Sequence, residues 1–249
     1  MTQQRRPSGH VSLNRALSKL GMLSRAQATD AIRAGRVSVD GRVVCDPSTP
    51  VIPERARIEV DGRRSRRQPH RTMAFHKPRG VVTTRRDPEG RRTVFDALGD
   101  AAEGLVAVGR LDLATSGLLL LTTDTQLANW LTDPQNAVPR VYIVTVRGRV
   151  TDADIETLMG GVSDRGDRLQ PSRVLLQKVS GRESHLLIEL TDGKNRELRR
   201  LFDAIGKAIT RLKRVRFGDV ELENLAPGEW RAVDPDSIVG GTGRRRMRT

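Results

Sequence analysis

An aspartate in an otherwise apolar stretch is the most informative feature of this chain. Asp112 is the only acidic residue between Glu103 and Asp124, and the segments 105–108 and 118–121 on either side have the composition of a protein core. An ionised carboxylate beside a packed interior is costly unless it is paired, so such a residue usually has a function or a partner. The alternative is an aspartate that caps the turn after a strand, which is the commoner role of a lone Asp.

A tyrosine is the second candidate for chemistry. Tyr142 is the only tyrosine of the chain, and it lies in an apolar stretch that we expect to be a strand. It could fill the core beside the sheet or serve a site. Other familiar sites are missing: there is no phosphate-binding glycine loop, Cys45 has no histidine near it in the sequence, and no second isolated acid pairs with Asp112.

A glycine followed by cations opens a predicted helix over residues 195–205, with Asn195 as its N-cap. Lys194 and Arg196 lie at this helix start, where exposed backbone N–H groups and side-chain charges together make an anion-binding site. Arg199 follows one turn later between two leucines. Its guanidinium is therefore expected at the edge of the core, where it could pair with a buried carboxylate.

Composition limits the class of protein. The net charge of +14 over 249 residues is carried almost entirely by arginine, which favours a polyanionic partner. No apolar run approaches the roughly 20 residues of a membrane span, and residues 1–10 lack the apolar segment of a signal peptide. The single cysteine fits a reducing compartment, and the four histidines lack metal-ligand spacing. We expect a cytoplasmic, nucleic-acid-binding monomer without a metal, a membrane or an obligate protein partner.

The chain is long enough for two domains. The first is predicted over residues 11–62, with a helix over 13–20 that ends at Gly21 and a second helix from a capping box at 24–27 to Gly35. A hairpin around Asp40-Gly41 and a short strand at 58–60 follow. This unit resembles the S4 RNA-binding domain, mainly through residues 25–44. Its phosphate-binding face is predicted to include Arg15, Arg25, Arg33 and Arg36.

A basic linker is predicted over 63–71, and a basic, disordered tail over 240–249. Between them, residues 72–235 form the larger predicted domain. Strands outnumber helices in it and few segments alternate as βαβ units, so we expect an α+β domain with a mainly antiparallel or mixed sheet. The predicted strands cover 105–108, 118–121, 141–146, 174–176 and 186–190, and the predicted helices cover 152–159 and 195–205.

The stretch GRLDLATSGLLLLTTD at 109–124 resembles the signature of the RsuA/RluB-type pseudouridine synthases. Three more stretches match that family in order, namely KPRGVVT at 77–83, GKNRELRR at 193–200 and LAPGEW at 225–230. An S4-like domain ahead of the catalytic domain is also the family's usual layout. The resemblance implies the pseudouridine synthase fold and a cofactor-free isomerisation of uridine in ribosomal RNA, with the large subunit favoured.

The resemblance also implies roles for individual residues. Asp112 would be the catalytic carboxylate, whether it attacks C1′, attacks C6 or removes a 2′ proton. Arg199 would pair with it, Tyr142 would stack on the target base and assist C5 deprotonation, and Arg110 would fill the space that an extruded base leaves. Two positions depart from the family pattern: Arg140 stands where Lys is common, and Glu197 where Gln is common.

Lys194, Asn195 and Arg196 would bind the substrate from the helix start. Two alternatives stay open. One is a non-catalytic RNA-binding factor in ribosome assembly, although such a protein would be expected to have lost one of Asp112, Tyr142 and Arg199. The other is a synthase that acts on tRNA or on small-subunit ribosomal RNA.

Overall fold

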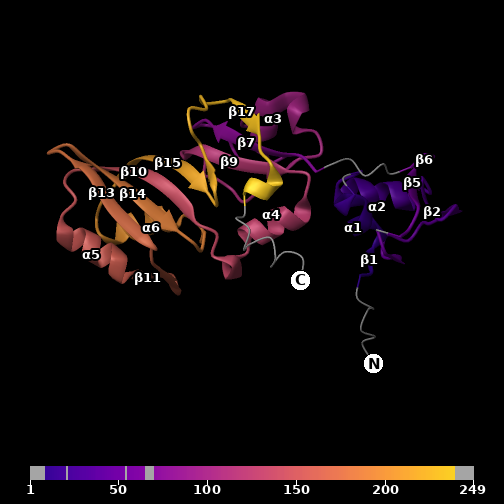
Figure 1. Cartoon of the computed structure of the whole chain (residues 1–249), viewed down its shortest axis with the longest axis horizontal. Coiled ribbons are helices and arrows are strands. Elements are labelled where there is room, and N and C mark those ends of the chain that lie inside the picture. Colours follow the sequence, from indigo (N-terminus) through magenta and orange to yellow (C-terminus); the bar gives the residue numbers. More distant parts are fainter. Residues whose placement is uncertain (1–8, 21, 54, 65–69, 239–249) are drawn as a thin grey trace. The chain divides into compact units, whose positions relative to one another are not determined.

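The computed structural model describes residues 9–20, 22–53, 55–64 and 70–238 (Figure 1). They divide into two compact units. The first covers the described residues up to His70 together with Thr123–Thr125, and the second covers Arg71–Thr122 and the described residues from Gln126 onward. The predicted tail at 240–249, the linker residues 65–69 and the predicted helix end at Gly21 lie outside the described residues. No helix within the described ranges is long and apolar enough to cross a membrane.

The first unit is a pair of helices against small antiparallel sheets. Helices α1 (Leu13–Lys19) and α2 (Arg25–Arg33) pack on the sheet β3-β2-β5-β6, whose strands are Arg42–Val43, Val37–Val39, Ile58–Val60 and Arg63–Arg64. The last of these strands lies where the sequence predicted the start of the linker. A separate pair joins β1 (Val11–Ser12) to β4 (Pro50–Val51).

Two local predictions in this unit are confirmed. The Ser24 hydroxyl accepts from the backbone N–H of Gln27 at 3.3 Å, and the Gln27 side chain accepts from the Ser24 N–H at 3.0 Å, which is the predicted capping box. The hairpin turns at Asp40 and Gly41, with φ of 51° and 82°. Two consecutive left-handed residues give the turn the twist that its flanking strands require.

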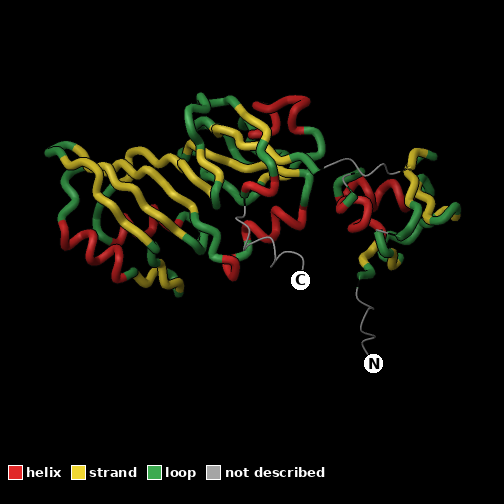
Figure 2. The backbone as a smooth tube through the Cα atoms, viewed as in Figure 1, coloured by secondary structure: helices red, strands yellow, loops and turns green. Residues whose placement is uncertain are grey.

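The second unit is built on one mixed sheet, which Figure 2 shows as a continuous twisted surface. In the described part of the chain it has nine strands in the order β13-β14-β10-β15-β9-β7-β17, with β16 beside β15 and β8 beside β9. The β9–β15 pair is parallel and the other pairs of this sheet are antiparallel. The strands are β7 (Thr72–Lys77), β8 (Val106–Ala107), β9 (Ser116–Thr122), β10 (Arg140–Arg147), β13 (Arg173–Val179), β14 (Glu183–Leu190), β15 (Ile209–Phe217), β16 (Val220–Glu221) and β17 (Trp230–Ala232).

Helices cover both faces of this sheet. Helices α3 (Val94–Leu98), α5 (Asp152–Gly160) and α6 (Glu197–Ala204) contribute to one apolar core, and α4 (Thr125–Thr132) contributes to the other. Strand β9 lies between the two cores, because Leu119 and Leu121 belong to the first and Leu118 and Leu120 to the second. A strand buried on both faces needs apolar residues at every position, which explains the unbroken run of leucines.

The remaining elements are short. Strands β11 (Val162–Asp164) and β12 (Asp167–Leu169) form a hairpin, and 3₁₀ turns cover Gly99–Ala102, Pro134–Asn136 and Pro235–Ser237. The strands and helices predicted in this unit are all present, with bounds that differ by a few residues. The sequence did not predict β7, β15, α3, α4 or the hairpin.

The parallel contact between β9 and β15 requires a glycine. Gly117 has φ of +107°, and a Cβ atom on it would lie 2.1 Å from the carbonyl oxygen of Arg214. The two backbones can approach only because this position carries no side chain. The approach brings Arg214 directly beside the end of the segment that contains Asp112.

Candidate active site

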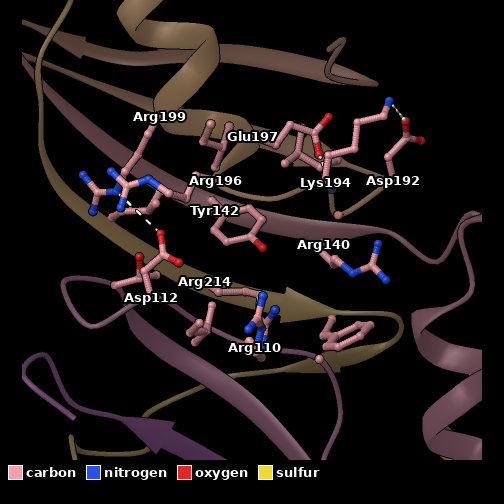
Figure 3. A pocket seen from close by; sticks show the side chains of 18 of the residues that line it. Arg110, Asp112, Arg140, Tyr142, Asp192, Lys194, Arg196, Glu197, Arg199 and Arg214 are labelled. Atoms are coloured by element: carbon pink, nitrogen blue, oxygen red, sulfur yellow. Dashed lines mark hydrogen bonds and ion pairs between the residues drawn. The ribbon is translucent and has the colours of Figure 1, made fainter. Parts of the chain in front are cut away.

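The predicted chemistry residues meet at a pocket of about 170 Å³ in the second unit. Strands β10 and β15 contribute its floor, and the start of α6 and the loop before β9 contribute its walls (Figure 3). Six of the seven residues predicted for catalysis or substrate binding line this pocket: Arg110, Asp112, Tyr142, Lys194, Arg196 and Arg199. Asn195 does not belong to the lining.

The loop that carries Asp112 is held by its backbone. Three of its carbonyl groups, at alternating positions, accept hydrogen bonds from the segment 77–83. These bonds run from Lys77 Nζ to Thr115 O (2.8 Å), from Gly80 N to Leu113 O (2.8 Å) and from Thr83 Oγ1 to Leu111 O (2.9 Å). The stretch KPRGVVT therefore has a structural role, since it fixes the loop on which Asp112 lies.

Lys77 is the buried member of this set. Its ammonium group is fully enclosed and donates to the carbonyls of Thr115 (2.8 Å) and Pro78 (3.0 Å). Burial lowers the pKa of Lys77 to about 8, while the charge of Asp112 acts to raise this pKa and that of Arg214 acts to lower it further. A buried cation thus lies beneath the loop, close enough to Asp112 to interact with it electrostatically.

The carboxylate of Asp112 lies open to the pocket. Its side chain is 39% exposed, so it lies at the edge of the packed interior and not within it. Oδ2 lies 3.7 Å from Nε of Arg199, which is the predicted pair, although the distance is too long for a hydrogen bond. Within the described ranges the carboxylate accepts no side-chain hydrogen bond. Its oxygens are therefore available to a substrate.

Tyr142 lies on the pocket face of β10 and is 9% exposed. Its ring also belongs to the apolar core that covers this face of the sheet. The two explanations that the sequence left open are therefore compatible. One part of the ring packs into the core, and another part lines the cavity beside Asp112 (Figure 3).

The start of α6 differs from the prediction. The helix begins at Glu197 and its N-cap is Arg196 in a left-handed conformation (φ 49°), so Asn195 as the N-cap is wrong. Glu197 itself accepts from the backbone N–H of Lys194 at 3.1 Å. Burial raises the pKa of the Glu197 carboxyl, and its Oε1 has no hydrogen-bond partner among the described residues. Lys194 pairs with Asp192.

Two acidic side chains of the protein, Glu197 and Asp192, thus already occupy the donors at the helix start. A ligand anion would compete with Glu197 and Asp192 for the backbone amide and the ammonium group. Arg196 and Arg110 are exposed beside the pocket and form no ion pair in the described part of the chain.

The sequence did not identify two buried arginines as members of the site. Arg140 and Arg214 are 5% and 2% exposed, and their guanidinium carbons lie 5.0 Å and 4.9 Å from the centre of the Phe217 ring. Arg140 was noted only as a departure from the family pattern. A usable signal was the alternation along β15, where Leu212 and Arg214 share the buried face. A charged residue on such a face is expensive and calls for an explanation.

The four arginines predicted to bind RNA lie in the first unit. Arg15, Arg25, Arg33 and Arg36 are all exposed. Arg36 pairs with Asp61 at 3.1 Å, and Arg33 lines a shallow polar depression with Ser12 and Asn14.

Comparisons with known proteins agree with the fold and with the two-domain family layout. A model of the RNA pseudouridylate synthase family matches residues 71–204, and a model of the S4 domain matches residues 11–54. The protein named ribosomal large subunit pseudouridine synthase B in Escherichia coli O6:H1 is 41% identical to this chain, and the alignment covers 89% of this chain and 79% of the relative. The protein of the same name in Vibrio cholerae is 39% identical, and the alignment covers 89% of this chain and 71% of the relative.

A solved pseudouridylate synthase has a TM-score of 0.64 and 27% identity, covering 92% of this chain and 100% of that chain. The chain belongs to the RNA pseudouridylate synthase family, whose members isomerise uridine in RNA to pseudouridine, and it carries an S4 domain ahead of the catalytic domain. The resemblance seen in the sequence is confirmed.

Proposed function

We propose that this protein isomerises a specific uridine of large-subunit ribosomal RNA, with Asp112 as the catalytic carboxylate. The observation that carries the assignment is an acid free of side-chain hydrogen bonds in the described structure, 3.7 Å from Arg199, at the wall of a pocket in a chain of this family. The relatives named for the large subunit support the choice of RNA.

The reaction needs no net change in atoms or electrons. The C1′–N1 bond of uridine breaks, the uracil turns within the pocket, and a C1′–C5 bond forms. The C5 proton is lost and N1 gains a proton. Asp112 would serve as an ionised group in each of the three routes, as a nucleophile at C1′, as a nucleophile at C6 or as a base at the 2′ position. Arg199 holds a positive charge beside it.

The pocket supports a target base taken out of its helix. Tyr142 offers a ring face on the floor, and Asp112 lies at the side (Figure 3). Extrusion of a paired base costs a few kcal/mol, about the amount that stacking on an aromatic ring can return. Arg110, exposed at the pocket, is suited to fill the space that the base leaves.

The first unit would hold the RNA outside the pocket. Its exposed arginines and the net charge of +14 suit contacts with phosphates. We assign RNA binding to residues 11–62 and catalysis to residues 72–235, and we place the activity in the cytoplasm, where ribosomal RNA is the substrate.

A pseudouridine map of all ribosomal RNA tests the proposal. Cells lacking the gene are complemented with the wild type or with Asp112→Asn, which removes the charge and keeps the size. We expect one large-subunit site to disappear in the deletion and to return only with the wild type. A site restored by Asp112→Asn would contradict the role of the carboxylate. An unchanged map would direct the search to tRNA or to a role in assembly without catalysis.

A further inference from the structure

Arg214 is a buried cation with few partners. Its side chain is 2% exposed, and its Nε donates to the carbonyl of Leu118 at 2.7 Å. A guanidinium has five N–H donors. In the described structure no other acceptor is within reach, Nη2 is enclosed without a partner, and no carboxylate lies within 4.0 Å. Most of the donors of this side chain are therefore unused.

The neighbouring arginines are better supplied with acceptors or opposite charge, although Nε of Arg216 is, like Nη2 of Arg214, enclosed without a hydrogen-bond partner in the described structure. Arg140, also buried, donates to the carbonyls of Thr191 (2.7 Å) and Leu131 (3.0 Å). Arg216, two residues along β15, pairs with Glu189 at 2.7 Å. Two carbonyl oxygens thus accept from Arg140, and the carboxylate of Glu189 compensates the charge of Arg216. Among the described residues Arg214 has one carbonyl acceptor and no carboxylate partner, so its remaining donors are available to a ligand in the pocket.

The position of Arg214 points to that ligand. In the register of the sheet, Arg214 pairs with Tyr142 of β10 on one side and with Gly117 of β9 on the other. Side chains at paired positions project from the same face, with Cβ atoms about 4.5–5.5 Å apart. Both Arg214 and Tyr142 line the pocket, as Figure 3 shows. A base stacked on the tyrosine would thus have a buried guanidinium next to it.

A buried charge without a partner is strongly unfavourable. Its presence beside a substrate pocket therefore favours a ligand that carries negative charge there. The uracil is neutral when it enters, but it becomes negative during the reaction.

Negative charge develops on the base in each of the three routes. When the C1′–N1 bond breaks, by attack at C1′ or by loss of the 2′ proton to Asp112, its electron pair stays on N1 and spreads to O2 and O4. When Asp112 adds to C6, the electrons of the C5–C6 double bond move to O4. The charge is consumed when the C1′–C5 bond forms. The C5 proton is then lost, its electron pair returns to the ring, and N1 gains a proton.

We propose that Arg214 is a catalytic residue that donates to a carbonyl oxygen of the extruded uracil and stabilises the negative charge that forms on the base. This inference rests on the proposed function. It gives the enzyme a preorganised, buried donor at the place where charge appears. Removing one such donor from other enzymes costs about 10²–10³-fold in turnover.

The test uses single-turnover isomerisation of an RNA fragment that contains the mapped uridine, with the full-length protein in excess. Arg214→Met keeps the length and loses the charge, Arg214→Lys keeps the charge, and Arg216→Met is the matched control on the same strand. We expect about a 10²–10³-fold loss for Arg214→Met, partial recovery for Arg214→Lys, and wild-type rates for Arg216→Met. RNA affinity and the unfolding temperature are measured for each variant.

A second measurement separates a chemical role from a structural one. The target uridine is replaced by 2-thiouridine or 4-thiouridine, because sulfur is a weaker hydrogen-bond acceptor than oxygen. If Arg214 contacts one oxygen, the corresponding thio substitution slows the wild type but has little further effect on Arg214→Met. Should the Met variant not fold, the same cycle is run with Arg214→Lys.

The outcomes are distinct. Loss of activity that couples to one of the two oxygens supports the inference. A rate for Arg214→Met within a few-fold of the wild type, or additive effects at both oxygens, overturns it. If the wild type itself converts no uridine in the mapped RNA, the proposed function fails first and the role of Arg214 fails with it.

Discussion

The buried Lys77 gives a prediction about pH. Burial lowers the pKa of this ammonium group from 10.5 to about 8 in the folded protein. A shift of one pKa unit corresponds to about 1.4 kcal/mol, so the folded state disfavours the charged lysine by about 3 kcal/mol. Above the unfolded-state pKa of 10.5 the lysine is neutral in both states, so the folded protein bears no such cost. The cost appears as the pH falls below 10.5 and is complete once the pH has fallen through about 8. The stability of the wild type therefore rises with pH across this window.

Lys77→Met removes the titrating group and keeps a side chain of similar length. We expect the unfolding free energy of the wild type, minus that of the variant, to increase by about 2–3 kcal/mol between pH 7 and pH 10. At pH 7 the variant also leaves the Thr115 and Pro78 carbonyls without their donor, at about 1–3 kcal/mol each. This loss and the relief of the buried charge act in opposite directions, so the change with pH is the cleaner quantity.

Urea unfolding followed by tryptophan fluorescence measures the free energy of unfolding of the second unit, which contains Lys77. The two tryptophans of the chain, Trp130 and Trp230, both lie in the second unit, in α4 and β17. The exposed Lys178→Met serves as the control for general effects of losing a lysine. A difference between wild type and Lys77→Met that stays constant or shrinks from pH 7 to pH 10 would refute the reasoning.

Three further substitutions or deletions test other parts of the structure. Gly117→Ala should destabilise the second unit by about 3 kcal/mol or more, because its Cβ would meet the backbone of β15 at 2.1 Å. The control Gly160→Ala has open space around it and should be nearly neutral, as measured by thermal unfolding. Thr83→Val removes the hydroxyl that bonds the backbone of Leu111 and should lower the free energy of unfolding by about 1–3 kcal/mol. Turnover should fall by up to about 10²-fold as the catalytic loop shifts. An unchanged rate would show that the loop does not depend on this bond. Removal of residues 1–62 should weaken RNA binding and flatten its salt dependence by about 0.7–0.9 in log–log slope for each phosphate that the first unit neutralises, and an unchanged slope in a binding titration would contradict the role of this unit.

The sequence predicted the features that depend on local pattern. The capping box at Ser24 and the hairpin at Asp40 form as expected, because neighbours along the chain determine them. The pairing of Asp112 with Arg199 was also expected, from the family resemblance and from an arginine flanked by leucines.

What the sequence missed depends on contacts between distant segments. Arg214 is buried because a glycine lets β9 approach it and because β10 lies on its other side, and neither is visible in the residues around it. The cap of α6 was misassigned for a related reason. Asn195 is the better N-cap by propensity, but the buried Glu197 already accepts the backbone N–H of Lys194, and the chain enters the helix through a left-handed Arg196.

The way in which the Asp112 loop is held has a consequence for how this enzyme can change. Its anchors are backbone carbonyls, which every amino acid supplies, whereas the side chains of Leu113 and Ala114 are exposed. Mutations at these two positions can accumulate without moving the carboxylate. The exposed surface of this loop can thus change, by selection or in the laboratory, while the reactive centre stays in place.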